Sequence, residues 1–140
     1  MKTRKGVAAV VFTNIRGNKK YLILKRKLHW KGYEFLKGGL KKGENEDNAI
    51  RREIREETGK LSPEYKLKKT NLSYSFAYER PFIQDKELWA GSKNRVYTAE
   101  FDNPYIRLDK DEHSGFKWMS KKDALRLLTW PNQKDILRKF

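Results

Sequence analysis

The sequence predicts an α/β sandwich around a mixed β-sheet, and three observations support this prediction. An apolar, β-branched run at residues 6–13 is followed by a turn and a second apolar run at residues 21–24, which predicts a pair of strands. Residues 45–58 show helical periodicity between two residues suited to helix ends. Strands and helices then follow one another without a strict βαβ order, which favours a mixed sheet over a purely parallel one.

The first half of the chain contains a hairpin and one long helix. Gly17 and Asn18 predict the turn between the first two strands. Residues 28–43 contain four glycines, and we expect them to form a loop. The helix at residues 45–58 has Asn45 as its predicted N-cap and Gly59 as the residue that ends it.

The second half begins with two further strand candidates. They lie at residues 66–78 and 93–101. The intervening residues 79–92 contain Pro81 and Gly91, and we expect them to form a surface loop.

The C-terminal part is predicted to be a short strand followed by two helices. Residues 116–119 form the strand candidate. Ser120 and Asp123 match a capping box at the start of the first helix, and Pro131 suits the first turn of the last one.

Length and composition indicate one soluble domain over residues 1–140. Seven Phe, seven Tyr and four Trp can fill a core, and the absence of cysteine excludes a disulfide scaffold, a zinc–cysteine site and thiol catalysis. No segment approaches the roughly 18 apolar residues of a membrane span. The apolar run at residues 7–12 is too short for a signal-peptide core. We therefore expect a cytoplasmic protein with no membrane association, and a monomer.

The net charge of +15 favours a polyanionic partner such as a nucleotide, a polyphosphate or RNA. The charge is uneven. Residues 1–42 contain thirteen Lys or Arg and a single acid, Glu34, whereas residues 43–60 contain six acids and four bases. An acidic cluster within a basic chain suggests a cation site beside an anion site, although a solubilising surface explains the charge alone equally well.

The acidic cluster lies on the helix at residues 45–58. At about 100° per residue, three glutamates fall within roughly one quarter of the helix circumference: Glu53, Glu56 and Glu57. They border the apolar sector, whose members are Ala49, Ile50 and Ile54. Three arginines are expected on the other side: Arg51, Arg52 and Arg55.

Carboxylates at this spacing repel one another, and a bound Mg²⁺ or Mn²⁺ would relieve the repulsion. A solvated helix held by pairs such as Arg52–Glu56 is the alternative. The preceding glycine-rich segment favours the metal site, because its lysines, Lys37, Lys41 and Lys42, could hold a polyphosphate against the cation. The segment lacks the Gly-Lys-Ser/Thr of a P-loop, which excludes that class of ATPase or GTPase.

These residues resemble the Nudix box, G-x5-E-x7-R-E-U-x-E-E-x-G-U, where U is a bulky aliphatic residue. Gly38 and Glu44 match its first two fixed positions, and the run REIREETG at residues 52–59 matches the rest. The last position is the single departure, because Lys60 stands where an aliphatic residue is expected. We expect the neighbouring Leu61 to fill that packing role.

The resemblance implies the α/β/α sandwich of Nudix hydrolases, which cleave diphosphate bonds with the help of divalent cations. Glu53, Glu56 and Glu57 would bind the metal, with the Gly38 carbonyl as a further ligand. Arg52 would orient the glutamates and take part in catalysis with them, and Glu44 would support the junction between the loop and the helix.

The C-terminal third resembles the ending of diadenosine tetraphosphate hydrolases, L-S-x-E-H-x-x-Y-x-W. The matching runs are IRLDKDEH at residues 106–113 and FKWM at residues 116–119. In that subgroup the glutamate of the Glu-His pair joins the metal site, which implies Glu112 here. Glu100 is the competing distal acid. His113 is assigned to the substrate phosphates, with capping of the loop as its alternative.

The subgroup implies asymmetrical cleavage of diadenosine tetraphosphate to AMP and ATP. Lys37 and Lys41 would bind phosphate, and Trp89 or Tyr78 would stack on the adenine, with Phe82 as a further candidate. An RNA 5′-end pyrophosphohydrolase shares the box and fits the charge. A catalytically silent Nudix domain that binds nucleic acid is the third possibility, against which the intact glutamates argue.

Overall fold

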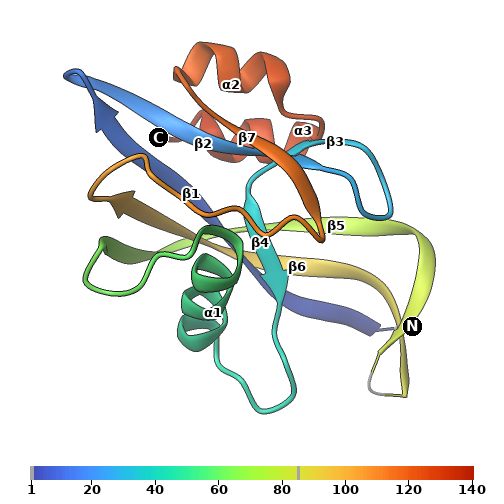
Figure 1. Cartoon of the computed structure of the whole chain (residues 1–140). Helices are drawn as coiled ribbons and strands as arrows, with labels where there is room; N and C mark the ends of the chain where they lie inside the picture. Colours follow the sequence, from blue (N-terminus) through green and yellow to red (C-terminus); the bar gives the residue numbers. More distant parts are fainter. Residues whose placement is uncertain (1, 85) are drawn as a thin grey trace.

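The computed structural model describes residues 2–84 and 86–140, without the side chains of residues 79, 80, 82 and 84. The N-terminal elements are β1 (Lys2–Ile15), β2 (Asn18–Arg26), β3 (Gly32–Glu34), β4 (Leu36–Gly39) and α1 (Glu46–Thr58). They are followed by β5 (Tyr65–Gln84), β6 (Glu87–Phe101), β7 (His113–Met119), α2 (Lys121–Leu127) and α3 (Pro131–Leu137) (Figure 1).

Strand β1 organises the sheet, because different parts of it pair with different neighbours. Residues 12–15 pair antiparallel with β2, and residues 6–9 pair antiparallel with β4. Along its other edge β1 runs parallel to β6, which gives the order β3-β2-β1-β6-β5, with β7 added to β2. The sheet is therefore mixed, as the sequence predicts, and β2 and β4 pair with different parts of β1.

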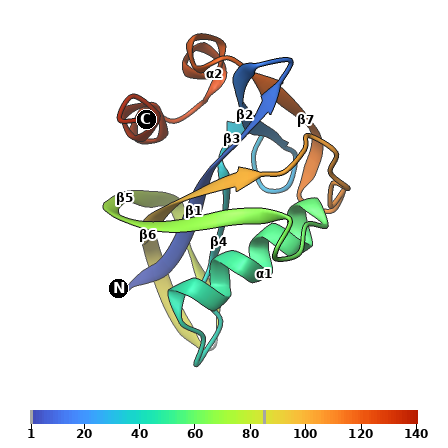
Figure 2. The ribbon, with the colours of Figure 1, turned by 90° about the vertical axis from the view of Figure 1, so that its left-hand side faces the viewer.

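Helices cover both faces of the sheet (Figure 2). Alternate residues of β1 point to opposite faces. Val7, Ala9 and Val11 belong to the apolar cluster that contains Ile50 and Ile54 of α1. Ala8 and Val10 belong to the second cluster, which contains Leu128 and Leu137 beside α2 and α3. The predicted α/β/α sandwich is confirmed.

The predicted helix ends are also confirmed. Asn45 Oδ1 accepts a hydrogen bond of 2.8 Å from the Asn48 amide, and Gly59 ends α1 with a φ of 75°. Ser120 caps α2 through the Asp123 amide, and Pro131 lies in the first turn of α3. Across the described part of the chain, no helix has the length and apolar character needed to cross a membrane.

The prediction that residues 28–43 form only a loop is wrong, because they contain β3 and β4. The glycines of β4 serve close contact rather than turning. A side chain at Gly38 would meet the carboxylate of Glu53 at 2.1 Å, and one at Gly39 would meet the guanidinium of Arg4 at 2.0 Å. Both contacts come from distant parts of the chain, so glycine content alone predicts the wrong structure here.

The loop prediction for residues 79–92 is wrong as well, because β5 and β6 form one long hairpin whose strands are paired almost to its tip. The strands lose register between Ala77 and Phe82, where Pro81 cannot donate to a strand ladder. Gly91 is needed because a side chain there would lie 2.5 Å from the Phe76 carbonyl oxygen. Trp89 therefore lies in a strand, half-buried, and Ala90, Gly91 and Ser92 form no turn.

The expectation that Leu61 replaces the missing aliphatic residue of the box is wrong. Leu61 is 54% exposed, whereas Lys60 is 4% exposed. The Lys60 amine bonds to Asp102 Oδ1 at 2.9 Å and Asn103 Oδ1 at 2.8 Å, and it lies 5.8 Å from the centre of the Phe101 ring. The lysine thus buries its aliphatic stem at the expected position and places its charge among polar partners.

We expect Lys60→Ala to lower the free energy of unfolding by about 1–3 kcal/mol, because it removes buried methylenes and two polar contacts. Leu61→Ala is expected to change it by less than about 0.5 kcal/mol. Urea unfolding of both variants measures the difference. A larger loss at Leu61 than at Lys60 would contradict this assignment of the packing position.

Candidate active site

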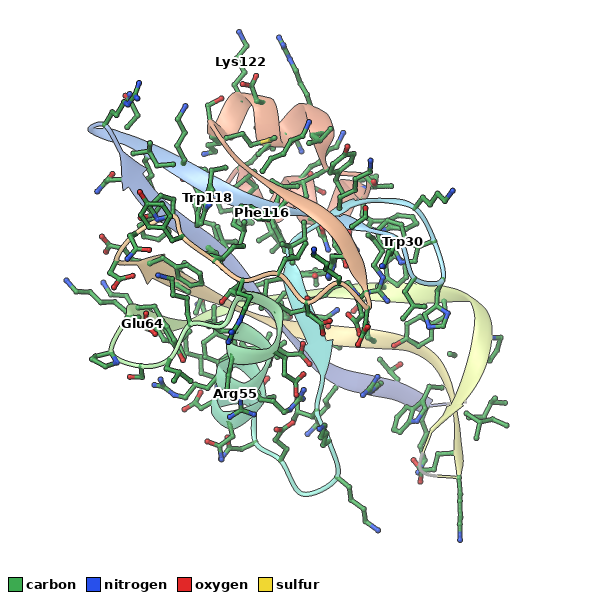
Figure 3. All side chains as sticks on the ribbon, in the orientation of Figure 1. Trp30, Arg55, Glu64, Phe116, Trp118 and Lys122 are labelled. Atoms are coloured by element: carbon green, nitrogen blue, oxygen red, sulfur yellow. The ribbon has the colours of Figure 1, made fainter. Side chains whose placement is uncertain are left out.

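Arg52 organises the first half of the site. It belongs to α1, and its guanidinium lies between the helix and the segment before it. Its Nε and Nη2 donate to the two carboxylate oxygens of Glu44 at 2.8 and 2.9 Å, and Nη2 also donates to the Gly39 carbonyl at 2.9 Å. Nη1 donates to Glu53 at 2.7 Å and to Glu56 at 3.3 Å. Arg52 is therefore not on the solvent side of the helix, where periodicity places it. Arg55, labelled in Figure 3, is exposed as expected.

The bonds of Arg52 fix the segment that leads into α1. Glu44 also accepts the Lys41 amide at 2.9 Å, so that one carboxylate joins the loop and the helix. The hydrogen bonds from Arg52 lower the pKa of Glu44 to about 2, with a smaller contribution from the Lys41 amide. Glu44 thus remains a carboxylate throughout the neutral range.

The two inner glutamates of α1 are held in a different way. Glu53 is 7% exposed and Glu57 is 2% exposed. Burial raises the pKa of Glu53 to about 7, since the bond to Arg52 only partly offsets it and the charges of Glu57 and Glu56 add to it. Burial also raises the pKa of Glu57, although His113 opposes the shift. Glu56 is more accessible, with 41% of its side chain exposed.

Glu112 lies next to Glu57, although 55 positions separate them in the sequence. Ligand atoms of Glu57, Glu112 and His113 all lie within 4.8 Å of one another. The backbone carbonyl of Glu112 accepts the amides of Lys27 and Leu28 at 2.9 and 3.2 Å, which ties its loop to the end of β2. Glu100 lies opposite Lys66 on the edge pair β5–β6 and lines a different cleft.

This donor set fits Mg²⁺ or Mn²⁺. The described residues bring together carboxylate oxygens from α1 and from the loop before β7, and the Gly38 backbone lies against Glu53. Hard divalent cations prefer such oxygen ligands, and a cation would favour the charged forms of two buried acids whose pKa values are raised.

His113 does not lie where a substrate ligand is expected. Its side chain is 1% exposed, and its two ring nitrogens lie 2.9 Å from Glu57 Oε2 and 2.8 Å from Glu34 Oε2. Burial alone would lower the pKa of His113, but the bonds and charges of Glu34 and Glu57 outweigh burial and raise it to about 9. Both ring nitrogens are thus occupied by carboxylates, and this geometry favours a role for His113 within the fold over the predicted contact with the substrate phosphates.

Glu34 and Arg26 are site residues that the sequence reasoning missed. The Glu34 side chain has no exposed surface, and Arg26 Nη1 lies 3.2 Å from Glu34 Oε2 and 3.3 Å from Glu112 Oε2. Burial would raise the pKa of Glu34, but Lys37, His113 and Arg26 together outweigh it and lower the pKa. One signal was present, since Glu34 is the single acid among the first 42 residues.

Positive charge lies close to the site. Lys37 Nζ lies 3.6 Å from Glu34 Oε1, and Lys41 is exposed. A cleft of about 570 Å³ lies beside the N-terminal end of α1. Its basic lining residues are Lys5, Lys69, Lys93 and Arg95, and Glu44, Glu46 and Asp47 also line it.

Aromatic rings gather at the hairpin side of the molecule. The ring centre of Tyr78 lies 6.2 Å from that of Phe76, which lies 4.8 Å from the ring centre of Trp130. Trp130 in turn lies 5.0 Å from Trp30, which Figure 3 shows in the loop between β2 and β3. The side chain of Phe82, a further candidate for base stacking, is outside the described residues.

Comparison with known proteins agrees with the geometry. The sequence profile of the NUDIX domain matches residues 2–140. The chain belongs to the Nudix family. No curated protein matches it. Among solved structures, an Ap4A hydrolase from C. elegans in a binary complex has a TM-score of 0.79 at 21% identity, with 99% of this chain and 95% of that chain covered.

Other Nudix structures are equally similar in fold. The dihydroneopterin triphosphate pyrophosphohydrolase of E. coli has a TM-score of 0.80 at 15% identity, with 99% of this chain and 96% of that chain covered. The NUDIX domain of NrtR from Shewanella oneidensis, complexed with ADP ribose, has a TM-score of 0.77 at 17% identity, with coverage of 99% and 86%. At these identities the likeness establishes the Nudix fold and leaves the substrate to be argued from the site.

Proposed function

We propose that this Nudix protein is a metal-dependent hydrolase that cleaves a phosphoanhydride bond in a dinucleoside polyphosphate such as diadenosine tetraphosphate, asymmetrically, to AMP and ATP. The observation that carries the proposal is the proximity of Glu57 and Glu112, whose carboxylate oxygens lie within 4.8 Å of each other. The Glu-His pair that resembles the diadenosine tetraphosphate hydrolases lies beside the helix of the Nudix box rather than in a remote loop.

Each residue has a defined task in this reaction. Glu53, Glu56, Glu57 and Glu112 would hold Mg²⁺ or Mn²⁺ together with the Gly38 carbonyl. A bound cation of this kind neutralises phosphate charge and lowers the pKa of the attacking water. A glutamate of the cluster would accept a proton from the attacking water. Arg52 holds Glu53 and Glu56 in place, and Lys37 and Lys41 contact the polyphosphate.

A substrate panel tests the proposal. It contains dinucleoside tetraphosphates, triphosphorylated RNA, ADP-ribose and other nucleotide sugars, dihydroneopterin triphosphate, inositol pyrophosphates and oxidised nucleoside triphosphates, with products separated by chromatography. We expect the highest kcat/KM for a dinucleoside tetraphosphate, with AMP and ATP as products. Preferred cleavage of any other substrate would contradict the assignment.

RNA 5′-end pyrophosphohydrolysis is the second candidate. The net charge of +15 and the basic residues of the cleft beside α1 favour it. A salt titration of RNA affinity together with a pyrophosphatase assay separates the candidates. An RNA hydrolase binds RNA tightly and has pyrophosphatase activity. A dinucleoside polyphosphate hydrolase has pyrophosphatase activity without tight RNA binding, and a silent binding module only binds RNA.

Glu112→Gln tests the assignment of the distal ligand. We expect kcat to fall about tenfold or more with KM nearly unchanged, because the variant removes one ligand charge without altering the phosphate contacts. Glu100→Gln is the matched control and should retain the kcat of the unaltered protein. If the two variants exchange these phenotypes, Glu100 is the distal acid instead.

Trp89→Ala tests the proposed base contact. Stacking on an aromatic ring contributes on the order of 1–3 kcal/mol per base, so that we expect KM for a dinucleoside tetraphosphate to rise about tenfold. Trp89 belongs to neither core cluster of the described residues, and the melting temperature should therefore change little. A large loss of melting temperature with unchanged KM would transfer the base contact to Tyr78, for which Tyr78→Ala is the corresponding test.

A further inference from the structure

A buried histidine, His113, links the helix of the Nudix box to the end of strand β3. Two carboxylates approach its ring, Glu57 at Nδ1 and Glu34 at Nε2, at 2.9 and 2.8 Å. The carboxylates are almost inaccessible, with 3% and 0% of their side chains exposed. Each uses its Oε2 atom for this contact, and therefore Glu57 keeps its Oε1 atom for another partner.

Glu34 is itself anchored. Arg26 Nη1 lies 3.2 Å from its Oε2 atom, and Lys37 Nζ lies 3.6 Å from its Oε1 atom. The same Arg26 atom lies 3.3 Å from Glu112. The contacts run from Glu57 through His113, Glu34 and Arg26 to Glu112, which is the chain neighbour of His113, so that one series of side-chain contacts joins two of the proposed metal ligands.

We propose that His113 is a positioning residue of the metal site. It holds Glu57 by one carboxylate oxygen and leaves the other oxygen for the cation, and Glu34 fixes the orientation of the imidazole ring. The proposal rests on the metal-dependent function proposed above. A carboxylate on a flexible side chain loses rotational freedom when it binds a metal, and a hydrogen bond that already fixes it reduces this loss.

The two ring nitrogens can be tested separately, because the amide nitrogen of asparagine superposes on Nδ1 of histidine and that of glutamine superposes on Nε2. His113→Asn keeps a donor toward Glu57 and loses the bond to Glu34. His113→Gln keeps a donor toward Glu34 and loses the bond to Glu57. The variants differ by one methylene group, so that differences between them report mainly on which bond is kept.

Mn²⁺ affinity is the decisive measurement, made by titration followed by electron paramagnetic resonance of free Mn²⁺. We expect His113→Gln to weaken Mn²⁺ binding about tenfold or more, the range found for partners of metal ligands, and His113→Asn to weaken it less than about threefold. The exposed His29 is the other histidine of the chain, and His29→Gln should bind Mn²⁺ like the unaltered protein. Equal affinities for all three variants would overturn the proposal.

Kinetics and melting temperatures separate positioning from other roles. Positioning predicts that His113→Gln lowers kcat with KM nearly unchanged. A direct substrate contact would instead raise KM with Mn²⁺ affinity intact. A purely structural role would lower the melting temperatures of both His113 variants equally, without a difference in Mn²⁺ affinity. Either result would overturn the proposal.

Glu34→Gln provides a variant that leaves the imidazole in place, should the His113 variants fail to fold. It is expected to weaken Mn²⁺ binding, and a Mn²⁺ affinity equal to that of the unaltered protein would contradict the linkage. Combined with His113→Asn it should add no further loss, because asparagine no longer reaches Glu34, whereas additive losses would contradict the linkage. If the unaltered protein binds Mn²⁺ but cleaves no member of the substrate panel, the substrate proposal fails, and the affinities still decide the role of His113.

Discussion

Removal of divalent cations is expected to abolish hydrolysis. Glu57 lies beside Glu112, and burial raises the pKa values of Glu53 and Glu57, so that a bound cation would stabilise the charged forms of these acids. A bound cation would stabilise the charge that develops in the transition state by several kcal/mol. Loss of about 4 kcal/mol of this stabilisation lowers the rate about a thousandfold.

Turnover in excess EDTA measures this effect, with the substrate that the panel identifies. We expect no detectable product in EDTA and recovery on addition of Mg²⁺ or Mn²⁺. EDTA saturated with Mg²⁺ beforehand is the control and should have no effect. Undiminished turnover in free EDTA would eliminate the metal mechanism and with it the role assigned to the glutamates of α1.

Glu57→Gln is expected to have the second largest effect, with kcat reduced by about a hundredfold or more. The change keeps the shape of the side chain and an oxygen that can accept from His113, but it removes a ligand charge at the centre of the cluster. Loss of one strong electrostatic contact in a transition state has this magnitude.

The melting temperature decides whether the loss is catalytic. Because burial raises the pKa of Glu57, a neutral amide costs the metal-free fold little, and we expect its melting temperature to stay within a few degrees of that of the unaltered protein. Glu100→Gln serves as the control again. Parallel losses of kcat in both variants, or a large fall in melting temperature, would show that folding rather than catalysis is affected.

The parts of the fold that depend on local interactions could be predicted from the sequence. Asn45 and Gly59 act on amides and dihedral angles within a few residues of themselves, and the 3.6-residue period places Glu53 and Glu57 at the edge of the buried face. The resemblance to the Nudix box implied the α/β/α sandwich, and the resemblance of the C-terminal third implied Glu112 as a metal ligand.

The errors arose where the deciding contact comes from far along the chain. Position 38 requires glycine because Glu53 occupies the space that a side chain would fill. His113 bonds to partners 56 and 79 positions away, which no local pattern encodes. The Arg52 side chain points inward because it donates hydrogen bonds to Glu44 and to the Gly39 carbonyl, although helical periodicity assigns it to the solvent side.

The tip of the long β5–β6 hairpin can be changed independently of the helix that carries the glutamates. Toward its tip the paired residues are Phe82–Trp89, Ile83–Leu88 and Gln84–Glu87, and the described neighbour outside the hairpin is Lys2. Ile83 and Leu88 are 74% and 46% exposed, so that little of the core depends on them. Inserted or exchanged residues at this tip leave α1 and its glutamates untouched. Hairpins transplanted from relatives thus offer a route to engineer new selectivity while the hydrolytic centre is inherited unchanged.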